Sequence, residues 1–86
     1  CISVNDVFVM GAWGQDQNVR GKVMMIADGS GKFVAATGLE LDLSARGMGI
    51  RSQRFSMLVE NSVVKNLNLD NRTFEKTSAE QMLSNL

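Results

Sequence analysis

The sequence contains no histidine and only one cysteine, Cys1, among its 86 residues. Without histidine, no imidazole can act as the base for a serine or cysteine nucleophile, and no cluster of cysteine and histidine can bind zinc. A single cysteine also excludes a disulfide within the chain and favours a reducing compartment. We therefore expect no bound metal, no cofactor and a cytoplasmic location.

The sequence also lacks net charge and long apolar runs. Nine Lys and Arg residues balance nine Asp and Glu residues, and the basic residues are scattered rather than clustered. Such a surface does not neutralise a row of phosphates or an anionic bilayer, so we expect no nucleic acid and no membrane as partners. The longest apolar runs are about five residues, whereas a helix that spans a membrane needs roughly 20.

The composition indicates an ordinary globular chain, 44% hydrophobic and 21% charged, with residues 1–86 in one domain of modest core. Glycine-containing stretches do not match nucleotide-binding patterns. Gly29-Ser-Gly31-Lys32 lacks the spacing of a phosphate loop, and Gly47-Met-Gly49 lacks the third glycine of a dinucleotide site. Asn71-Arg-Thr73 matches a glycosylation acceptor but is more typical of a turn.

Apolar spacing predicts a strand, a helix, a second strand and a short second helix in the first half. Asn5 or Asp6 can cap the first helix, because a short side-chain oxygen accepts hydrogen bonds from first-turn amides. The second strand is a continuous apolar run, typical of burial on both faces, and Phe8, Met24 and Met25 are expected in the core. The expected ranges are 1–4 and 22–27 for strands, 7–14 and 32–37 for helices, 28–31 for a turn, and 39–50 for an irregular connection with one helical turn.

Two apolar segments rich in β-branched residues, Arg54 to Glu60 and Val63 to Leu69, predict an antiparallel hairpin. Two residues separate them, and the first, Asn61, tolerates the positive φ that such a turn requires. Thr77 or Ser78 can then cap a terminal helix, and the Glu-Gln pair that follows can complete a capping box. The order strand, helix, strand, helix, hairpin, helix indicates an α/β fold.

Arg54 is the strongest candidate for a catalytic or ligand-binding residue. It begins a strand that continues with apolar side chains, so its guanidinium must reach water or pair with an anion. The planar fork of arginine can hold two oxygen atoms at once. From spacing alone, an arginine that is solvated or paired with a carboxylate is the more common arrangement, so both interpretations stay open.

Three stretches together resemble the C-terminal half of a type II (peroxiredoxin 5-like) peroxiredoxin: Cys1-Ile-Ser-Val-Asn-Asp6, Trp13-Gly14 and Arg54-Phe55-Ser56. The resemblance covers nearly the whole chain. It implies the C-terminal portion of a thioredoxin-like fold, which lacks the N-terminal strands and the helix of the peroxidatic cysteine. In that fold the first two strands pair in parallel and the hairpin extends the sheet.

The resemblance implies that the intact protein is a thiol-dependent peroxidase that reduces hydrogen peroxide and alkyl hydroperoxides. In this family an arginine at the position of Arg54 lies beside the peroxidatic cysteine, favours its thiolate and hydrogen-bonds the peroxide oxygens. The family motif with the attacking cysteine would lie upstream, so we expect the isolated 86 residues to be inactive. The alternative is a non-catalytic thioredoxin-like domain used for dimerisation or partner binding.

Cys1 and three further residues complete the implied site. A cysteine at the end of a buried strand is more often a buried thiol than a reactive one, although some type II members have a resolving cysteine there. The late cysteine of the animal members is absent, which implies an external reductant such as glutathione with glutaredoxin, or thioredoxin. Trp13, Gly47 and Met48 match the region of the subfamily's dimer contact, which implies a homodimer.

Overall fold

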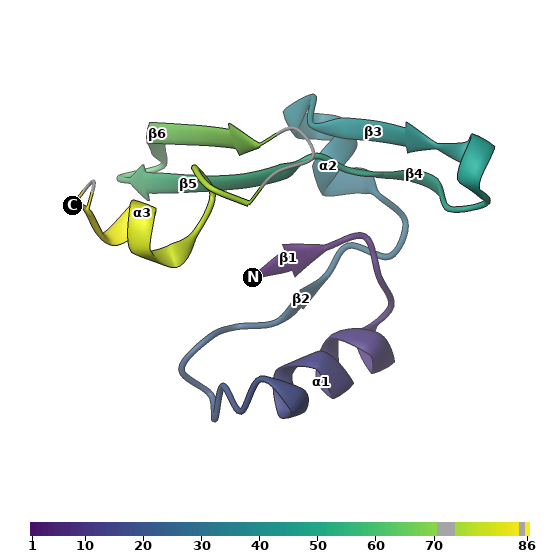
Figure 1. Ribbon diagram of the computed structural model, residues 1–86, viewed down its shortest axis with the longest axis horizontal. Coiled ribbons are helices and arrows are strands. Elements are labelled where there is room, and N and C mark those ends of the chain that lie inside the picture. The colour runs from purple at the N-terminus through teal and green to yellow at the C-terminus, as the bar shows by residue number, and fades with distance from the viewer. Residues whose placement is uncertain (71–73, 85) are drawn as a thin grey trace. The chain divides into compact units, whose positions relative to one another are not determined.

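The computed structural model describes residues 1–70, 74–84 and 86, and divides into two units, Cys1–Ser52 and Gln53–Leu86 (Figure 1). The expected turn at Asn71-Arg-Thr73 lies outside the described residues. In the described part of the chain, no helix has the length and apolar character that crossing a membrane requires.

The first unit opens with a parallel pair of short strands. Strand β1 (Ile2–Ser3) pairs with β2 (Ile26–Ala27), and helix α1 (Val7–Asp16) lies between them in the chain. Asp6 begins the helix, because its carboxylate accepts a hydrogen bond of 2.8 Å from the Val9 amide. These findings confirm the expected parallel pairing and the aspartate cap.

Helix α1 packs through a small part of its surface. Met10 is buried, and a Cβ atom added at Gly14 would lie only 3.1 Å from Cγ of Met25, so the glycine permits a close approach. The expectation of a core position is wrong for Phe8 and Met24, which are 83% and 76% exposed. Both residues lie on surfaces that no other part of their unit covers.

The second strand is also shorter and more exposed than expected. Only Ile26–Ala27 pairs with β1, whereas the apolar run predicts a strand over 22–27 buried on both faces. Both residues of β2 are exposed. The reason is that an apolar run reaches double burial only between two covering layers, and this pair has α1 as its principal packing neighbour in the first unit.

Helix α2 (Lys32–Thr37) follows the predicted turn and matches the predicted range. The Asp28 carboxylate accepts hydrogen bonds of 3.1 Å from the Phe33 and Val34 amides, which satisfies the free end of the helix. Gly38 ends the helix with a φ of 73°, a conformation that glycine adopts without strain. The buried side chain of Val34 anchors α2 in the first unit.

The connection expected to be irregular forms a second hairpin. Strand β3 (Glu40–Leu43) pairs antiparallel with β4 (Gly49–Ser52), and the short 3₁₀ helix η1 (Ser44–Arg46) joins them. The Asp42 carboxylate accepts a 2.9 Å hydrogen bond from the Ser44 amide and so begins η1. The expected helical turn is therefore confirmed, whereas the expectation of irregular structure on both sides of it is wrong.

The second unit is built on the predicted hairpin. Strand β5 (Arg54–Glu60) pairs antiparallel with β6 (Val63–Asp70), and Asn61 and Ser62 turn the chain with φ values of 50° and 63°. Two positive φ angles match the twist of a hairpin with a two-residue turn. Within the second unit, β5 and β6 pair with each other as a two-stranded sheet.

The chain ends in a short helix, α3 (Ala79–Ser84), which contacts β5. Ser78 precedes it, and its hydroxyl accepts a hydrogen bond of 3.1 Å from the Gln81 amide, as expected of a helix cap. The Gln81 side chain donates to the Ser84 hydroxyl. That side-chain amide therefore faces along the helix and does not complete the predicted capping box.

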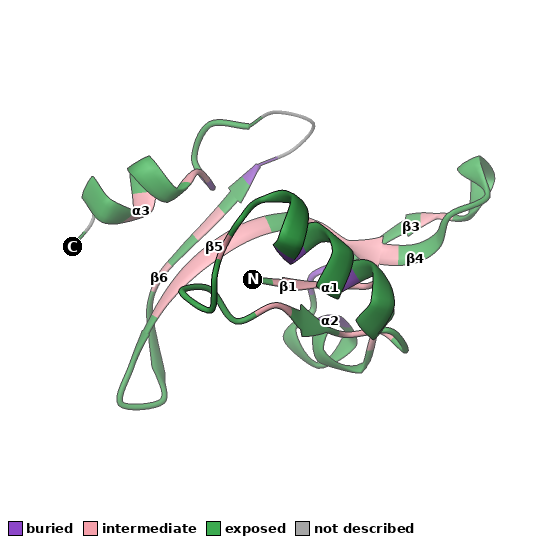
Figure 2. Cartoon of the chain, turned by 90° about the horizontal axis from the view of Figure 1, so that it is seen from below, coloured by how far each residue is buried: buried purple, intermediate pink, exposed green. Residues whose placement is uncertain are grey.

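Few large apolar side chains are buried. Met10, Val34 and Leu39 are buried, and most of the chain in Figure 2 has the colour of exposed residues. Exposed apolar side chains on this scale favour association, because burial of each one removes apolar surface from water. The exposed set includes Phe8, Met24, Trp13, Met48, Val59, Val63, Val64, Leu67, Leu69 and Phe74.

We therefore expect the 86-residue chain on its own to self-associate. Sedimentation velocity over a range of concentrations should show species larger than a monomer, and Phe8→Ser together with Met24→Ser should shift the distribution toward smaller species. Lys22→Ser, at an exposed polar position, serves as the matched control and should change nothing. A monomer at all concentrations with a cooperative thermal transition would contradict this expectation.

Candidate functional site

Arg54 lies at one end of the β5–β6 hairpin, directly opposite Asp70. A regular ladder continued from the two-residue turn would place Leu69 opposite Arg54. The pairing shifts between Leu58 and Val59, because Lys65 is an extra residue in β6 and forms a bulge. The bulge therefore brings a carboxylate and a guanidinium to the same end of the hairpin.

Asp70 organises the chain that follows it. Its side chain is buried, and Oδ2 accepts hydrogen bonds from the Glu75 amide at 3.0 Å, the Thr77 amide at 2.8 Å and the Thr77 hydroxyl at 2.7 Å. Oδ1 accepts a further bond of 3.1 Å from the Lys76 amide. Partial removal from water acts to raise the pKa of this carboxyl group, but these hydrogen bonds outweigh it and hold the pKa well below the usual range.

Thr77 links this carboxylate to Arg54. The Nε atom of Arg54 donates a hydrogen bond of 2.9 Å to the Thr77 hydroxyl oxygen. Since a guanidinium has no acceptor atom, the single hydroxyl proton of Thr77 is the one shared with Asp70. The result is a directed chain of hydrogen bonds from the guanidinium through the hydroxyl to the carboxylate.

Phe74 restricts the orientation of the guanidinium. The Cζ atom of Arg54 lies 4.1 Å from the centre of the Phe74 ring, within the range of a cation–π contact. Arg54 itself is exposed. In the described part of the chain, neither terminal nitrogen of its guanidinium donates a hydrogen bond. The site therefore presents an anchored guanidinium whose two terminal nitrogens can bind the oxygens of a ligand.

Cys1 belongs to the first unit, whereas Arg54 belongs to the second. Its thiol is free and exposed, so the interpretation of a buried thiol is wrong. Cys1 precedes β1 and is held through its backbone, since its nitrogen donates to the Met24 carbonyl and its own carbonyl accepts from the Ile26 amide. Neither interaction involves sulfur.

The three residues predicted at a dimer contact also lie in the first unit. Trp13 is in α1 and is 42% exposed, so its ring is half available to a partner. Gly47 and Met48 follow η1 at the turn of the β3–β4 hairpin, where Gly47 has a φ of 74° and the Met48 side chain is exposed. These positions are accessible, as a contact between subunits requires.

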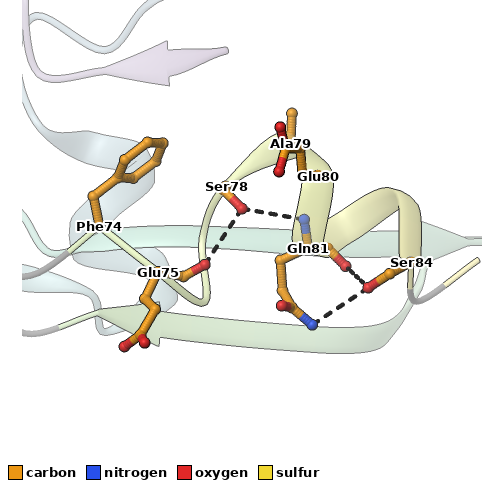
Figure 3. A pocket seen from close by; sticks show the side chains of 7 residues that line it. All are labelled: Phe74, Glu75, Ser78, Ala79, Glu80, Gln81 and Ser84. Carbon is orange, nitrogen blue, oxygen red and sulfur yellow. Dashed lines mark hydrogen bonds between the residues drawn. The ribbon is translucent and has the colours of Figure 1, made fainter.

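An open hollow of about 710 Å³ lies on the second unit, and Figure 3 shows the residues that line it. The Phe74 ring, which contacts Arg54, forms part of its wall. Ser78, Gln81 and Ser84 hydrogen-bond one another or nearby backbone atoms along α3, so these polar groups stabilise the helix. The remaining lining residues are Glu75, Ala79 and Glu80.

The sequence alone identifies Arg54 but not the residues that hold it. Asp70 does not stand out, because the regular register of the hairpin pairs its neighbour Leu69 with Arg54. Thr77 is predicted only as a helix cap, a role that the structure gives to Ser78. The alternation of apolar and polar residues in β6 is the signal that could have revealed the bulge and hence Asp70.

The chain matches known proteins along nearly its full length. A family model described as Redoxin matches residues 1–83. "Peroxiredoxin-2E, chloroplastic" from Arabidopsis thaliana is 47% identical over 89 residues, which cover all of this chain and 38% of that protein. The solved structure of reduced Prx3 from Vibrio vulnificus in complex with hydrogen peroxide is 46% identical, with a TM-score of 0.89 over 98% of this chain and 52% of that one.

A second solved structure agrees. Peroxiredoxin 5 from Alvinella pompejana is 40% identical, with a TM-score of 0.76 over 81% of this chain and 46% of that one. The chain thus spans about half the length, or less, of the relatives and structures that it matches.

The hydrogen bonds to Asp70 predict a local response to its loss. In Asp70→Asn, one acceptor oxygen replaces two, so the Glu75, Lys76 and Thr77 amides should exchange with solvent roughly tenfold faster or more. Hydrogen exchange followed by NMR at neutral pH measures this change. Glu60→Gln, which alters an exposed carboxylate beside the hairpin turn, is the control and should leave the three amides unchanged.

The same carboxylate predicts a pH dependence in the unmodified protein. Because the pKa of Asp70 is lowered in the folded state, its stabilising effect is complete above the usual aspartate pKa of about 3.9. The effect should decline as the pH falls below that value, and it should be gone once the pH is below the lowered folded pKa. Amide shifts of Glu75, Lys76 and Thr77 that titrate at the usual aspartate pKa would contradict the assignment.

Proposed function

This chain belongs to the Redoxin family, among the peroxiredoxins, and we propose that the intact protein is a thiol peroxidase that reduces hydrogen peroxide and alkyl hydroperoxides. The structural neighbours confirm the thioredoxin-like fold of this portion. The observation that carries the proposed activity is the Arg54 guanidinium, which is anchored through Nε and exposed at its terminal nitrogens.

In the proposed reaction, a cysteine thiolate attacks one oxygen of the peroxide and the O–O bond breaks. The sulfur becomes a sulfenic acid, and the other oxygen leaves as water or an alcohol after it takes up a proton. Negative charge moves from sulfur to the leaving oxygen during this step. A guanidinium beside both atoms stabilises that charge, and one well-placed donor of this kind contributes on the order of 3 kcal/mol.

The attacking thiolate lies, in this proposal, upstream of Cys1. Cys1 precedes a two-residue strand rather than a helix, and in the described part of the chain its sulfur makes no hydrogen bond that would stabilise a thiolate. We assign it no peroxidatic role. Cys1 is the one cysteine of these 86 residues, so a resolving disulfide would join it to the upstream cysteine.

The partners follow from the same chemistry. An external thiol, either glutathione with glutaredoxin or thioredoxin, reduces the sulfenic acid in this proposal. The exposed Trp13 ring, together with Gly47 and Met48, supports a homodimer through the first unit, because aromatic side chains are common anchors at interfaces. We propose a cytoplasmic location, because the one cysteine of these 86 residues forms no disulfide, as is usual in a reducing compartment.

The central test concerns Arg54 in the intact enzyme. Arg54→Ala should raise the pKa of the peroxidatic cysteine and slow its oxidation by roughly 100-fold or more, as loss of one preorganised donor does. Arg54→Lys should restore little, because an ammonium keeps the charge but loses the planar fork. Thiolate absorbance titration and single-turnover kinetics with hydrogen peroxide measure both effects.

Arg51 provides the matched control for this test. Its guanidinium donates a hydrogen bond of 2.9 Å to the Asn5 side chain within the first unit. Arg51→Ala should therefore leave the rate within a few-fold of the wild type. An Arg54→Ala enzyme that oxidises at the wild-type rate would remove the main support for the proposed mechanism.

The isolated 86-residue chain should show no peroxidase turnover. Its one thiol, Cys1, should react with hydrogen peroxide at about the rate of free cysteine, because no helix end or hydrogen bond to sulfur favours its thiolate in the described residues. Stopped-flow mixing gives this rate constant directly. A value orders of magnitude higher would show that Cys1 is the attacking residue, and that the thiolate does not lie upstream.

A further inference from the structure

Arg54 can stabilise a transition state only if its guanidinium is held in one orientation, and the described residues show what holds it. We propose that Thr77 is the positioning residue for Arg54, an inference that rests on the proposed peroxidase function. The Thr77 hydroxyl accepts the hydrogen bond from Arg54 Nε at 2.9 Å and shares its own proton with Asp70 at 2.7 Å. Its effect on the reaction is indirect, through the guanidinium.

Thr77 is itself fixed independently of Arg54. The residue is buried, and both its amide and its hydroxyl donate to the same oxygen of Asp70. With its proton committed to the carboxylate, the hydroxyl presents a lone pair toward Arg54. The hydroxyl oxygen is polarised by the ionised carboxylate, which strengthens the bond that it accepts from Nε.

The hydroxyl also keeps the guanidinium available. A carboxylate paired directly with arginine usually engages two nitrogens of the fork and offsets its charge. Here the connection from Arg54 to Asp70 runs through a neutral hydroxyl and uses Nε alone. The two terminal nitrogens, which a peroxide with two oxygens requires, are left for the ligand, and the Phe74 ring restricts the plane in which they lie.

Three variants of the intact enzyme test this role. Thr77→Val keeps the shape of the side chain but removes the oxygen, and it should lower kcat/KM for hydrogen peroxide roughly tenfold, the usual scale for one hydrogen bond to a charged group. Thr77→Ser retains the hydroxyl and should stay within a few-fold of the wild type. Ser78→Ala loses the adjacent hydroxyl, which caps α3 and does not contact Arg54, and should also stay near the wild type.

A double-mutant cycle separates positioning from general loosening of the fold. In an Arg54→Ala background, Thr77→Val should cause almost no further loss of rate, because its effect passes through the guanidinium. The same tenfold loss in both backgrounds would overturn the proposal. So would a Thr77→Val enzyme at the wild-type rate, or a Ser78→Ala enzyme as slow as Thr77→Val.

The hydrogen bond can also be followed without activity. The Nε–H group of Arg54 should exchange slowly with solvent in the wild type and in Thr77→Ser, and at least several-fold faster in Thr77→Val, as measured by NMR. Equal exchange in all three proteins would overturn the proposal. A wild-type enzyme without peroxidase activity but with this exchange pattern would instead overturn the proposed function, while the anchoring of Arg54 by Thr77 would stand.

Discussion

The pairing of β5 with β6 is the constraint on which the site depends, and a bulge at the extra residue Lys65 accommodates this pairing. Beyond the bulge, Phe55 pairs with Leu69 and Met57 pairs with Leu67, so apolar side chains share one face of the hairpin. If Lys65 were paired in a regular ladder, each of these two apolar residues of β5 would lie opposite an asparagine. The hydrophobic pattern therefore favours the shifted register, and that register places a carboxylate opposite the arginine of the candidate site.

Four aspartates show how the chain uses its negative charge. Each accepts at least one hydrogen bond from a backbone amide where the chain turns into the next element: Asp6, Asp28, Asp42 and Asp70. These carboxylates are committed to local structure, because amides without partners are costly and a carboxylate accepts several bonds at once. Arg54 differs, since it is anchored through Nε and its terminal nitrogens keep their capacity to bind oxygen atoms. The chain thus separates acids that support local structure from a cation whose terminal nitrogens can bind a ligand.

The sequence predicts the features that short-range chemistry determines. The Asp6 cap, the α2 range and the positive φ of Asn61 are all set by a few neighbouring residues, and each is confirmed. The β3–β4 hairpin is not predicted, because its glycines suggest irregular structure, whereas they allow the tight turn around η1. Burial is overestimated for Phe8. An apolar side chain favours burial, but the sequence does not show whether another element of the unit covers it. The hydrogen bonds that hold Arg54 are not predicted. They depend on the bulge in β6, which shifts the register of the hairpin and is not visible in the pattern of neighbouring residues.

The bulge also determines which changes of length the hairpin can accept. Lys65 has no partner of its own in β5, so a deletion of this one residue would leave every other pair in place and would only straighten the strand. Asp70 would still face Arg54. Strand β5 has no such spare residue, and a deletion there would force a new register or enlarge the bulge. Over evolutionary time, β6 should therefore tolerate the loss of one residue more readily than β5.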